Sequence, residues 1–195
     1  MAVNPCHKES MRNNKHYWQT VSSQVVHTNP YYSVNQDEVI RPDGTTGSYY
    51  VVQNEDVVHV VALDSSDNIY LVQISRYTND YISFELPAGQ TDGQKPLVAG
   101  RRELREETGL TAKTWKCLGY IRPAAGMMKA KSHVYLARQL QETTNHEQRE
   151  EAILKTVKIP IRQALNMVKE GKIVDGESIA SLMLAALELG FVNNY

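Results

Sequence analysis

The sequence is poor in the features that mark several classes of protein. Its 195 residues include only two cysteines, Cys6 and Cys117, which do not form a metal-binding motif. No apolar run approaches the ~20 residues that a membrane-spanning helix needs. The first residues also lack the apolar core of a secretory signal. We therefore expect a reducing, cytoplasmic setting and no membrane partner.

An excess of charge of one sign is also missing. The chain has 21 Lys and Arg against 22 Asp and Glu, so its formal net charge is −1. This balance gives no reason to expect binding to nucleic acid. A local phosphate site needs only a few Lys or Arg side chains, so the net charge does not exclude one. The 42% hydrophobic content is ordinary for a globular chain with one substantial core.

Short strands are predicted first along the chain and helices mainly at the end. β-Branched and aromatic runs separated by turn signals predict strands at 21–28, 31–40, 48–53, 56–64, 68–77, 83–89, 115–123, 132–140 and 152–160. Helices are predicted at 96–108, 161–170 and 177–189, and a charged loop at 141–151. This order favours an α+β protein, an α/β/α sandwich with a mixed central sheet preceded by antiparallel strands. The predicted division is a flexible segment 1–15, a β extension 16–55 and a catalytic domain 56–195.

One stretch concentrates charge, "ELPAGQTDGQKPLVAGRRELREETGL" from Glu85 to Leu110. On a helix of 3.6 residues per turn, Leu97, Leu104 and Thr108 form the stripe expected to face the core. Three acids, Glu103, Glu106 and Glu107, fall together on another face. A solvated face could carry them, because like-charge neighbours cost only about 0.2–0.5 kcal/mol per pair. The alternative is a site for a hard cation, since Mg²⁺ prefers carboxylate oxygens.

The order of residues favours the second interpretation. "RELREETGL" resembles the second half of the Nudix box, in which Arg-Glu, an aliphatic residue, any residue and Glu-Glu precede a glycine and an aliphatic residue. Every position of that half matches, and the preceding "ELPAG" also fits family usage. The resemblance implies a Nudix fold and hydrolysis of a nucleoside diphosphate linked to another group.

The first half of the box departs from the family pattern. Seven residues before Arg102 the family has a glutamate, but this chain has Gln94. Four residues rather than five separate Gly89 from that position. In the family this glutamate mostly supports the metal site, so we expect weakened or altered metal binding. A degenerate site that only binds nucleotides is the alternative.

The resemblance also implies roles for the charged helix. Glu103, Glu107 and Glu106 are the expected metal ligands, joined by the backbone carbonyl of Ala88. Glu106 is also assigned to the catalytic set. Arg102 is expected to orient the carboxylates through charge-assisted hydrogen bonds, with a plain surface salt bridge as its alternative.

A further acid usually comes from the loop before the last strand. Here "HEQREEAI" supplies Glu147, Glu150 and Glu151. Spacing favours Glu151 as a metal ligand, which leaves Glu150 or Glu147 as the general base. Ordinary solvated loop acids are the alternative for each.

Substrate contacts are also carried over by resemblance, here to the ADP-ribose and nucleotide-sugar pyrophosphatase branch. Arg76 is expected to hold a phosphate, or else to be an ordinary edge-strand arginine. Glu85 is also expected to bind the substrate. Trp18 is expected to stack on a base, with burial in the N-terminal sheet as its alternative. Pro123 begins the loop "PAAG", in which Ala125 stands near the branch's second proline.

The resulting prediction is a hydrolase that uses Mg²⁺, or Mn²⁺, on ADP-ribose or a related nucleotide sugar. It would act as a homodimer built with its N-terminal strands. Alternatives are GDP-mannose, a dinucleotide or a nucleoside triphosphate as substrate, or a Nudix-fold binding module. An unrelated α+β protein with a charged helix would require the motif to be a coincidence.

Overall fold

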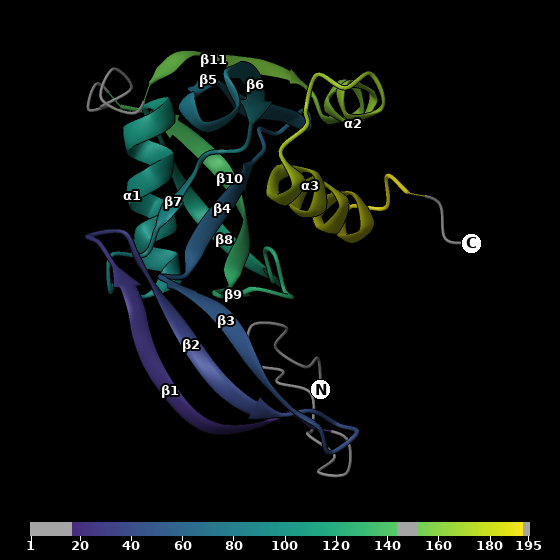
Figure 1. Ribbon diagram of the computed structural model, residues 1–195. Helices are drawn as coiled ribbons and strands as arrows, with labels where there is room; N and C mark the ends of the chain where they lie inside the picture. The colour runs from purple at the N-terminus through teal and green to yellow at the C-terminus, as the bar shows by residue number, and fades with distance from the viewer. Residues whose placement is uncertain (1–16, 144–151, 193–195) are drawn as a thin grey trace.

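A computed structural model describes residues 17–143 and 152–192 of the chain (Figure 1). Three sheets organise these residues. The N-terminal sheet has the order β1-β2-β3-β9, with bounds Gln19–Thr28, Tyr32–Ile40, Thr46–Asn54 and Met128–Lys129. The central sheet has the order β7-β4-β10-β8, with bounds Ala88–Gln90, Val57–Ala62, Ser132–Glu142 and Leu110–Ile121. The third has the order β11-β5-β6, with bounds Ile153–Pro160, Asn68–Arg76 and Tyr81–Glu85.

The central sheet is mixed, as predicted. β4 and β10 run parallel, whereas β7 and β8 pair antiparallel with them. Helix α1 (Pro96–Thr108) and helix α3 (Gly176–Glu188) lie on opposite sides of this sheet, and α2 (Ile161–Lys169) packs against β11 and β5 (Figure 1). The N-terminal sheet projects away from this sandwich.

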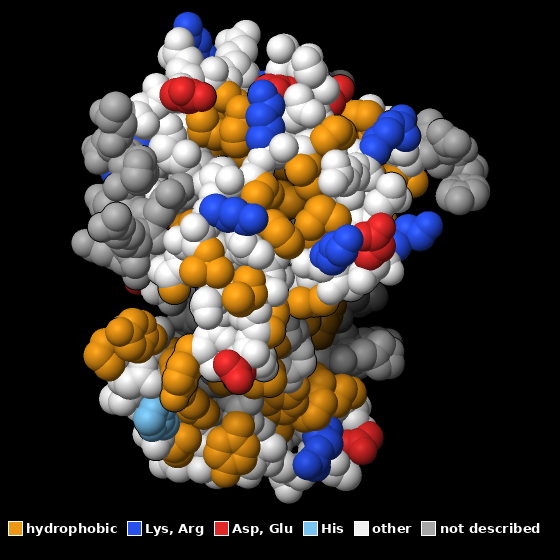
Figure 2. All heavy atoms as spheres, turned by 90° about the horizontal axis from the view of Figure 1, so that it is seen from above, with side chains coloured by type: hydrophobic (Ala, Val, Ile, Leu, Met, Phe, Trp, Pro, Cys, Tyr) orange, Lys and Arg blue, Asp and Glu red, His pale blue; other side chains and the backbone are white. Residues whose placement is uncertain are grey.

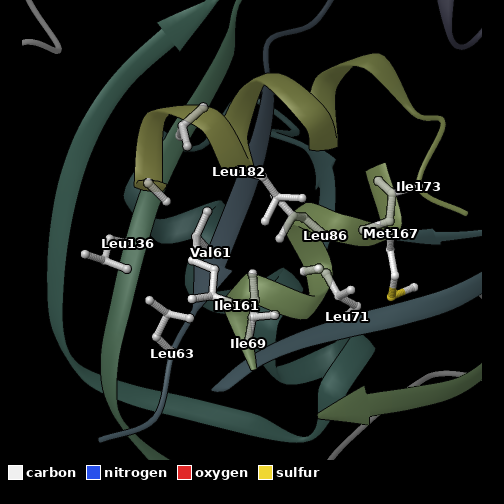
Figure 3. Packing of buried hydrophobic residues seen from close by; sticks show 13 residues of the cluster. Val61, Leu63, Ile69, Leu71, Leu86, Leu136, Ile161, Met167, Ile173 and Leu182 are labelled. Carbon is white, nitrogen blue, oxygen red and sulfur yellow. The ribbon is translucent and has the colours of Figure 1, made fainter. Parts of the chain in front are cut away.

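Strand β4 shows why the sheet is covered on both faces. Val58 and Val60 belong to the apolar cluster beneath α1, whereas Val61 belongs to the larger cluster beneath α2 and α3. A strand whose two faces are both buried reads as a continuous apolar run, as "VVHVVAL" does. The larger cluster is drawn in Figure 3 and includes the buried residues Leu63, Ile69, Leu71, Leu86, Leu136, Ile161, Met167, Ile173 and Leu182.

The ends of α1 agree with the local sequence signals. Pro96 occupies its first turn, where a missing N–H costs nothing. Gly109 ends it with φ of 70° and donates its N–H to the carbonyl of Arg105 at 2.8 Å. Because β8 follows at Leu110, it begins earlier than the predicted residue 115. Its first residues pair with Glu142 and Gln141 of β10, a register that their polar sequence did not reveal.

Removing packed volume from the larger core should destabilise the protein. Leu182 of α3 is fully buried, whereas Leu187 on the same helix is 56% exposed. We expect Leu182→Ala to lower the free energy of unfolding by about 2–5 kcal/mol, because the vacated space is only partly refilled. Leu187→Ala should change it by at most about 0.5 kcal/mol. Urea unfolding followed by circular dichroism would measure both, and equal effects would contradict this assignment of the core.

Candidate active site

The acids of α1 are not a solvated face. Glu103 and Glu107 are 5% and 4% exposed, and Glu106 is half-buried. The expected core stripe is correspondingly displaced: Leu104 is fully buried, but Leu97 and Thr108 are only partly so. An ionised carboxylate is costly to bury without partners. The groups that contact the two buried glutamates therefore identify the site to which they belong.

Glu107 and Glu103 both meet the short strand β7. The Oε2 atom of Glu107 accepts a hydrogen bond from the backbone N–H of Ala88 at 3.0 Å. The Glu103 carboxylate lies against Gly89 so closely that a Cβ atom there would be 2.2 Å from its Oε1 atom. A side chain at position 89 would therefore force that carboxylate to move. The Ala88-Gly89 corner and the two glutamates thus form one unit.

Arg102 lies at the edge of this unit. Its Nη2 atom is 2.8 Å from Glu103 Oε1, and its Nη1 atom donates to Glu106 Oε2 at 3.2 Å. Nη2 also donates to the carbonyl of Gln90 at 2.8 Å and to Asp92 Oδ2 at 2.7 Å. Partial burial acts to lower the pKa of Arg102, but the surrounding carboxylates outweigh it and raise this pKa. The alternative of a plain surface salt bridge does not describe a guanidinium with four such partners.

Asp92 is a contact that the sequence analysis missed. Gln94, the residue found where the family has a glutamate, is exposed in the turn before α1. Two residues earlier, Asp92 brings a carboxylate to Arg102. The shortened loop therefore still presents an acid to this arginine. The only signal in the sequence was an acid close to the altered position.

Arg76 and Glu85 form a second charged unit, on β5 and β6. The Nη2 atom of Arg76 is 2.5 Å from Glu85 Oε2, and its Nε atom lies 3.1 and 3.2 Å from the two carboxylate oxygens. Glu85 is 3% exposed and the Arg76 side chain 46%. The bond to Glu85 raises the pKa of Arg76, and the charges of Asp175 and Glu107 add to it. Arg76 Nη1 makes no hydrogen bond within the described residues and is available to a ligand.

Trp18 and Pro123 lie elsewhere, at the N-terminal sheet. Trp18 is 49% exposed rather than buried in that sheet, and its ring meets Tyr49 edge-on at 5.3 Å. Together they line a cavity of about 200 Å³. The hydroxyl of Tyr49 donates to the carbonyl of Gly126, in the loop that Pro123 begins. Within the described part of the chain, no hydrogen bond or ring contact joins Trp18 or Pro123 to the α1 acids.

His59 is a buried polar group that the sequence analysis also missed. It lies on β4 directly opposite Ala88 of β7 and is 4% exposed. Its Nδ1 atom has no hydrogen-bond partner among the described residues. Burial lowers the pKa of His59, although Glu177, Asp175 and Glu85 act in the opposite direction. Nothing in an apolar run of sequence distinguishes such a histidine from core packing.

The oxygen donors on α1 match the chemistry of a hard divalent cation. Carboxylates and backbone carbonyls are the ligands that Mg²⁺ and Mn²⁺ prefer. Among residues 17–143 and 152–192, however, no three His, Cys, Asp or Glu side chains stand in a group that could hold a metal. The candidate loop acids Glu147, Glu150 and Glu151 lie outside those ranges.

The described residues near that loop contact the end of α1. The N–H of Thr143 donates to the carbonyl of Gly109 at 2.8 Å. After the loop in the sequence, Thr156 Oγ1 donates to the carbonyl of Glu107 at 3.4 Å. Both contacts fall within two residues of Glu107.

Comparison with known proteins shows the family to which the chain belongs. A model of the nucleoside diphosphate sugar hydrolase N-terminal domain matches residues 18–52, and a model of the NUDIX domain matches residues 53–182. No helix among the described residues is long and apolar enough to cross a membrane.

Two curated relatives and one solved structure are similar over most of their length. An ADP-ribose pyrophosphatase of Mycobacterium tuberculosis is 36% identical, over 91% of this chain and 87% of its own. A CMP-5'-(N-acetyl-N-hydroxy-3-aminopropyl)phosphonate hydrolase of Streptomyces rubellomurinus is 29% identical, over 89% and 84%. The crystal structure of an ADP compounds hydrolase shares the fold, with a TM-score of 0.79, 17% identity and coverage of 94% and 98%. The chain therefore belongs to the Nudix family and is a Nudix hydrolase of the ADP-ribose pyrophosphatase type.

Proposed function

We propose that this protein hydrolyses the pyrophosphate bond of ADP-ribose or a related nucleoside diphosphate sugar with the help of Mg²⁺. The products are a nucleoside monophosphate and a sugar phosphate. The observation that carries this proposal is the pair of buried carboxylates, Glu103 and Glu107, held against the Ala88-Gly89 corner. The 36% identical ADP-ribose pyrophosphatase supports the choice of substrate.

Nudix hydrolases generally use divalent metal ions, and the α1 site offers suitable oxygens. Glu103, Glu106 and Glu107, with the Ala88 carbonyl and Glu151, would hold Mg²⁺, or Mn²⁺ in its place. When bound, such an ion offsets the charge of the diphosphate and lowers the pKa of water at the site.

The chain's own groups would do the remaining work. Arg76, fixed by Glu85, presents its free Nη1 to a phosphate oxygen, because a guanidinium matches phosphate geometry. Arg102 keeps Glu103 and Glu106 oriented. Glu150, or Glu147 in its place, accepts the proton of the attacking water.

We propose further that Asp92 takes over the supporting role of the glutamate replaced by Gln94. Its carboxylate contacts Arg102 at 2.7 Å, so Arg102 keeps an acidic partner on the loop side. This favours a working site over a degenerate binding module. The two differ in whether Mg²⁺ stimulates any turnover.

The N-terminal sheet would complete the substrate site of a second copy. All ten residues of β1 are exposed, and it forms one edge of its sheet. A long, exposed, partly apolar edge strand is a template for association. Among the described residues, no hydrogen bond or ring contact joins Trp18 or Pro123 to the α1 acids of their own chain. In a homodimer, Trp18 could stack on the base held by the partner.

Removing one buried charge of the α1 site should abolish hydrolysis. We expect Glu107→Gln to lower the Mg²⁺-dependent rate by more than the ~10–100-fold typical of losing a residue that only supports a ligand. Glu188→Gln, which breaks a surface pair with Lys116, should leave the rate unchanged. Release of AMP, GMP and sugar phosphate would be measured with ADP-ribose, GDP-mannose and a dinucleotide. Binding of ADP-ribose by the wild-type protein without AMP release would favour the binding module.

A side chain at position 89 should disturb the same site sterically. In Gly89→Ala the Cβ atom would overlap the Glu103 carboxylate, so we expect Mg²⁺ affinity to fall by ~10-fold or more. Gly176→Ala is the matched control, because a Cβ atom there meets nothing within 4 Å. Isothermal titration with Mn²⁺ and Mg²⁺ would measure the metal affinity of both variants. Unchanged affinity in Gly89→Ala would contradict a role for the observed Glu103 position in metal binding.

Charges placed on β1 should break the proposed dimer. Val21 and Val25 are 65% and 60% exposed. We expect their joint replacement by Lys to convert a dimer to a folded monomer, because charged edge strands resist pairing. Joint replacement of Met183 and Leu187, which are exposed on α3, by Lys controls for added charge away from β1. Size-exclusion chromatography with light scattering gives the masses, and a monomeric wild-type protein would end this part of the proposal.

A further inference from the structure

Each of the four residues from Glu85 to Ala88, where β6 leads into β7, makes a hydrogen bond or ion pair with a different element. Glu85 pairs with Arg76 of β5. The Pro87 carbonyl accepts a hydrogen bond from the N–H of Val60, on β4, at 2.9 Å. The Ala88 N–H donates to Glu107 of α1. Between them, the Leu86 N–H donates to the Oγ atom of Ser178, on α3, at 3.0 Å.

Ser178 is fully buried and lies 92 residues from Leu86 in the sequence. Its backbone N–H separately donates to the capping residue of α3, reaching Asp175 Oδ2 at 2.6 Å. The two bonds use different atoms, so the hydroxyl is not needed to cap the helix. Its role is to accept a buried N–H that would otherwise have no partner.

We propose that Ser178 is a positioning residue for the hydrolytic reaction. Its hydroxyl fixes the Leu86 peptide, and through that peptide the orientation of Glu85 on one side and of the Ala88 backbone on the other. The site is therefore held from both faces of the central sheet, by α1 through Glu107 and by α3 through Ser178. This inference rests on the proposed function, because it concerns the same corner.

Helix α3 also offers a matched control. Ser181 is fully buried one turn further along, and its Oγ atom finds no hydrogen-bond partner in the part of the chain that the structure describes. Ser178→Ala and Ser181→Ala therefore each remove one buried hydroxyl from the same helix. Only Ser178→Ala also removes the acceptor of the Leu86 N–H. Any difference between them reports on the Leu86 bond.

The experiment compares Ser178→Ala, Ser181→Ala and Ser178→Thr, which keeps the hydroxyl. The measurements are kcat and KM for ADP-ribose, Mn²⁺ affinity by titration without substrate, and hydrogen exchange of the Leu86 amide. We expect Ser178→Ala to lower kcat and Mn²⁺ affinity by ~10-fold, with KM within about twofold, and to accelerate exchange at Leu86. Ser178→Thr should keep kcat and Mn²⁺ affinity close to the wild-type values, and Ser181→Ala should change neither kcat nor Mn²⁺ affinity. Ser178→Cys, which keeps a weaker acceptor, gives a milder variant if Ser178→Ala does not fold.

Equal effects of Ser178→Ala and Ser181→Ala would overturn the proposal. So would a Ser178→Ala variant that unfolds at lower temperature but keeps wild-type kcat and Mn²⁺ affinity while folded. If the wild-type protein hydrolyses no nucleotide sugar, the proposed function fails. Mn²⁺ affinity and Leu86 exchange would still decide the part played by Ser178.

Discussion

The structure depends on the burial of two carboxylates between a helix and a three-residue strand. Glu103 and Glu107 lie on the inner side of α1, where water cannot solvate them fully. Such charges persist only with compensating partners. The Ala88 N–H and the Arg102 guanidinium supply them, and Gly89 supplies the space. The contacts of these two carboxylates therefore join the helix to the strand.

This arrangement suits a hydrolase whose substrate carries several negative charges. A cluster of acids would repel a diphosphate on its own, and the divalent cation proposed above would offset that repulsion. The hydrogen bonds that fix Glu103, Glu107 and the segment from Glu85 to Ala88 hold the oxygens in place before anything binds. Preorganised oxygens on rigid elements are the arrangement that catalysis by a bound cation requires.

The central sandwich and the N-terminal sheet carry different groups of candidate site residues. The central sandwich holds the acids and Arg76, whereas the projecting N-terminal sheet carries Trp18, Tyr49 and the contact to the loop after β8 (Figure 1). Figure 2 shows hydrophobic side chains in the open on the face seen from above, interrupted by Lys and Arg. The proposed association with another copy rests on the exposed edge strand β1 of the N-terminal sheet.

Local signals in the sequence were enough for the motif and for most elements, but not for the start of β8 or for the short strand β9. Pro96 and Gly109 set the ends of α1 because proline and glycine act on their own residue's backbone. The matching positions from Arg102 to Leu110 pointed to the family because their spacing is a property of one helix. The depth of Glu103 and Glu107, the contact of Asp92 with Arg102, the buried ring of His59 and the hydroxyl of Ser178 beneath Leu86 were decided only by the tertiary structure. Each depends on residues distant in the chain meeting in one packed interior, and neither propensity nor spacing within a short window carries that information.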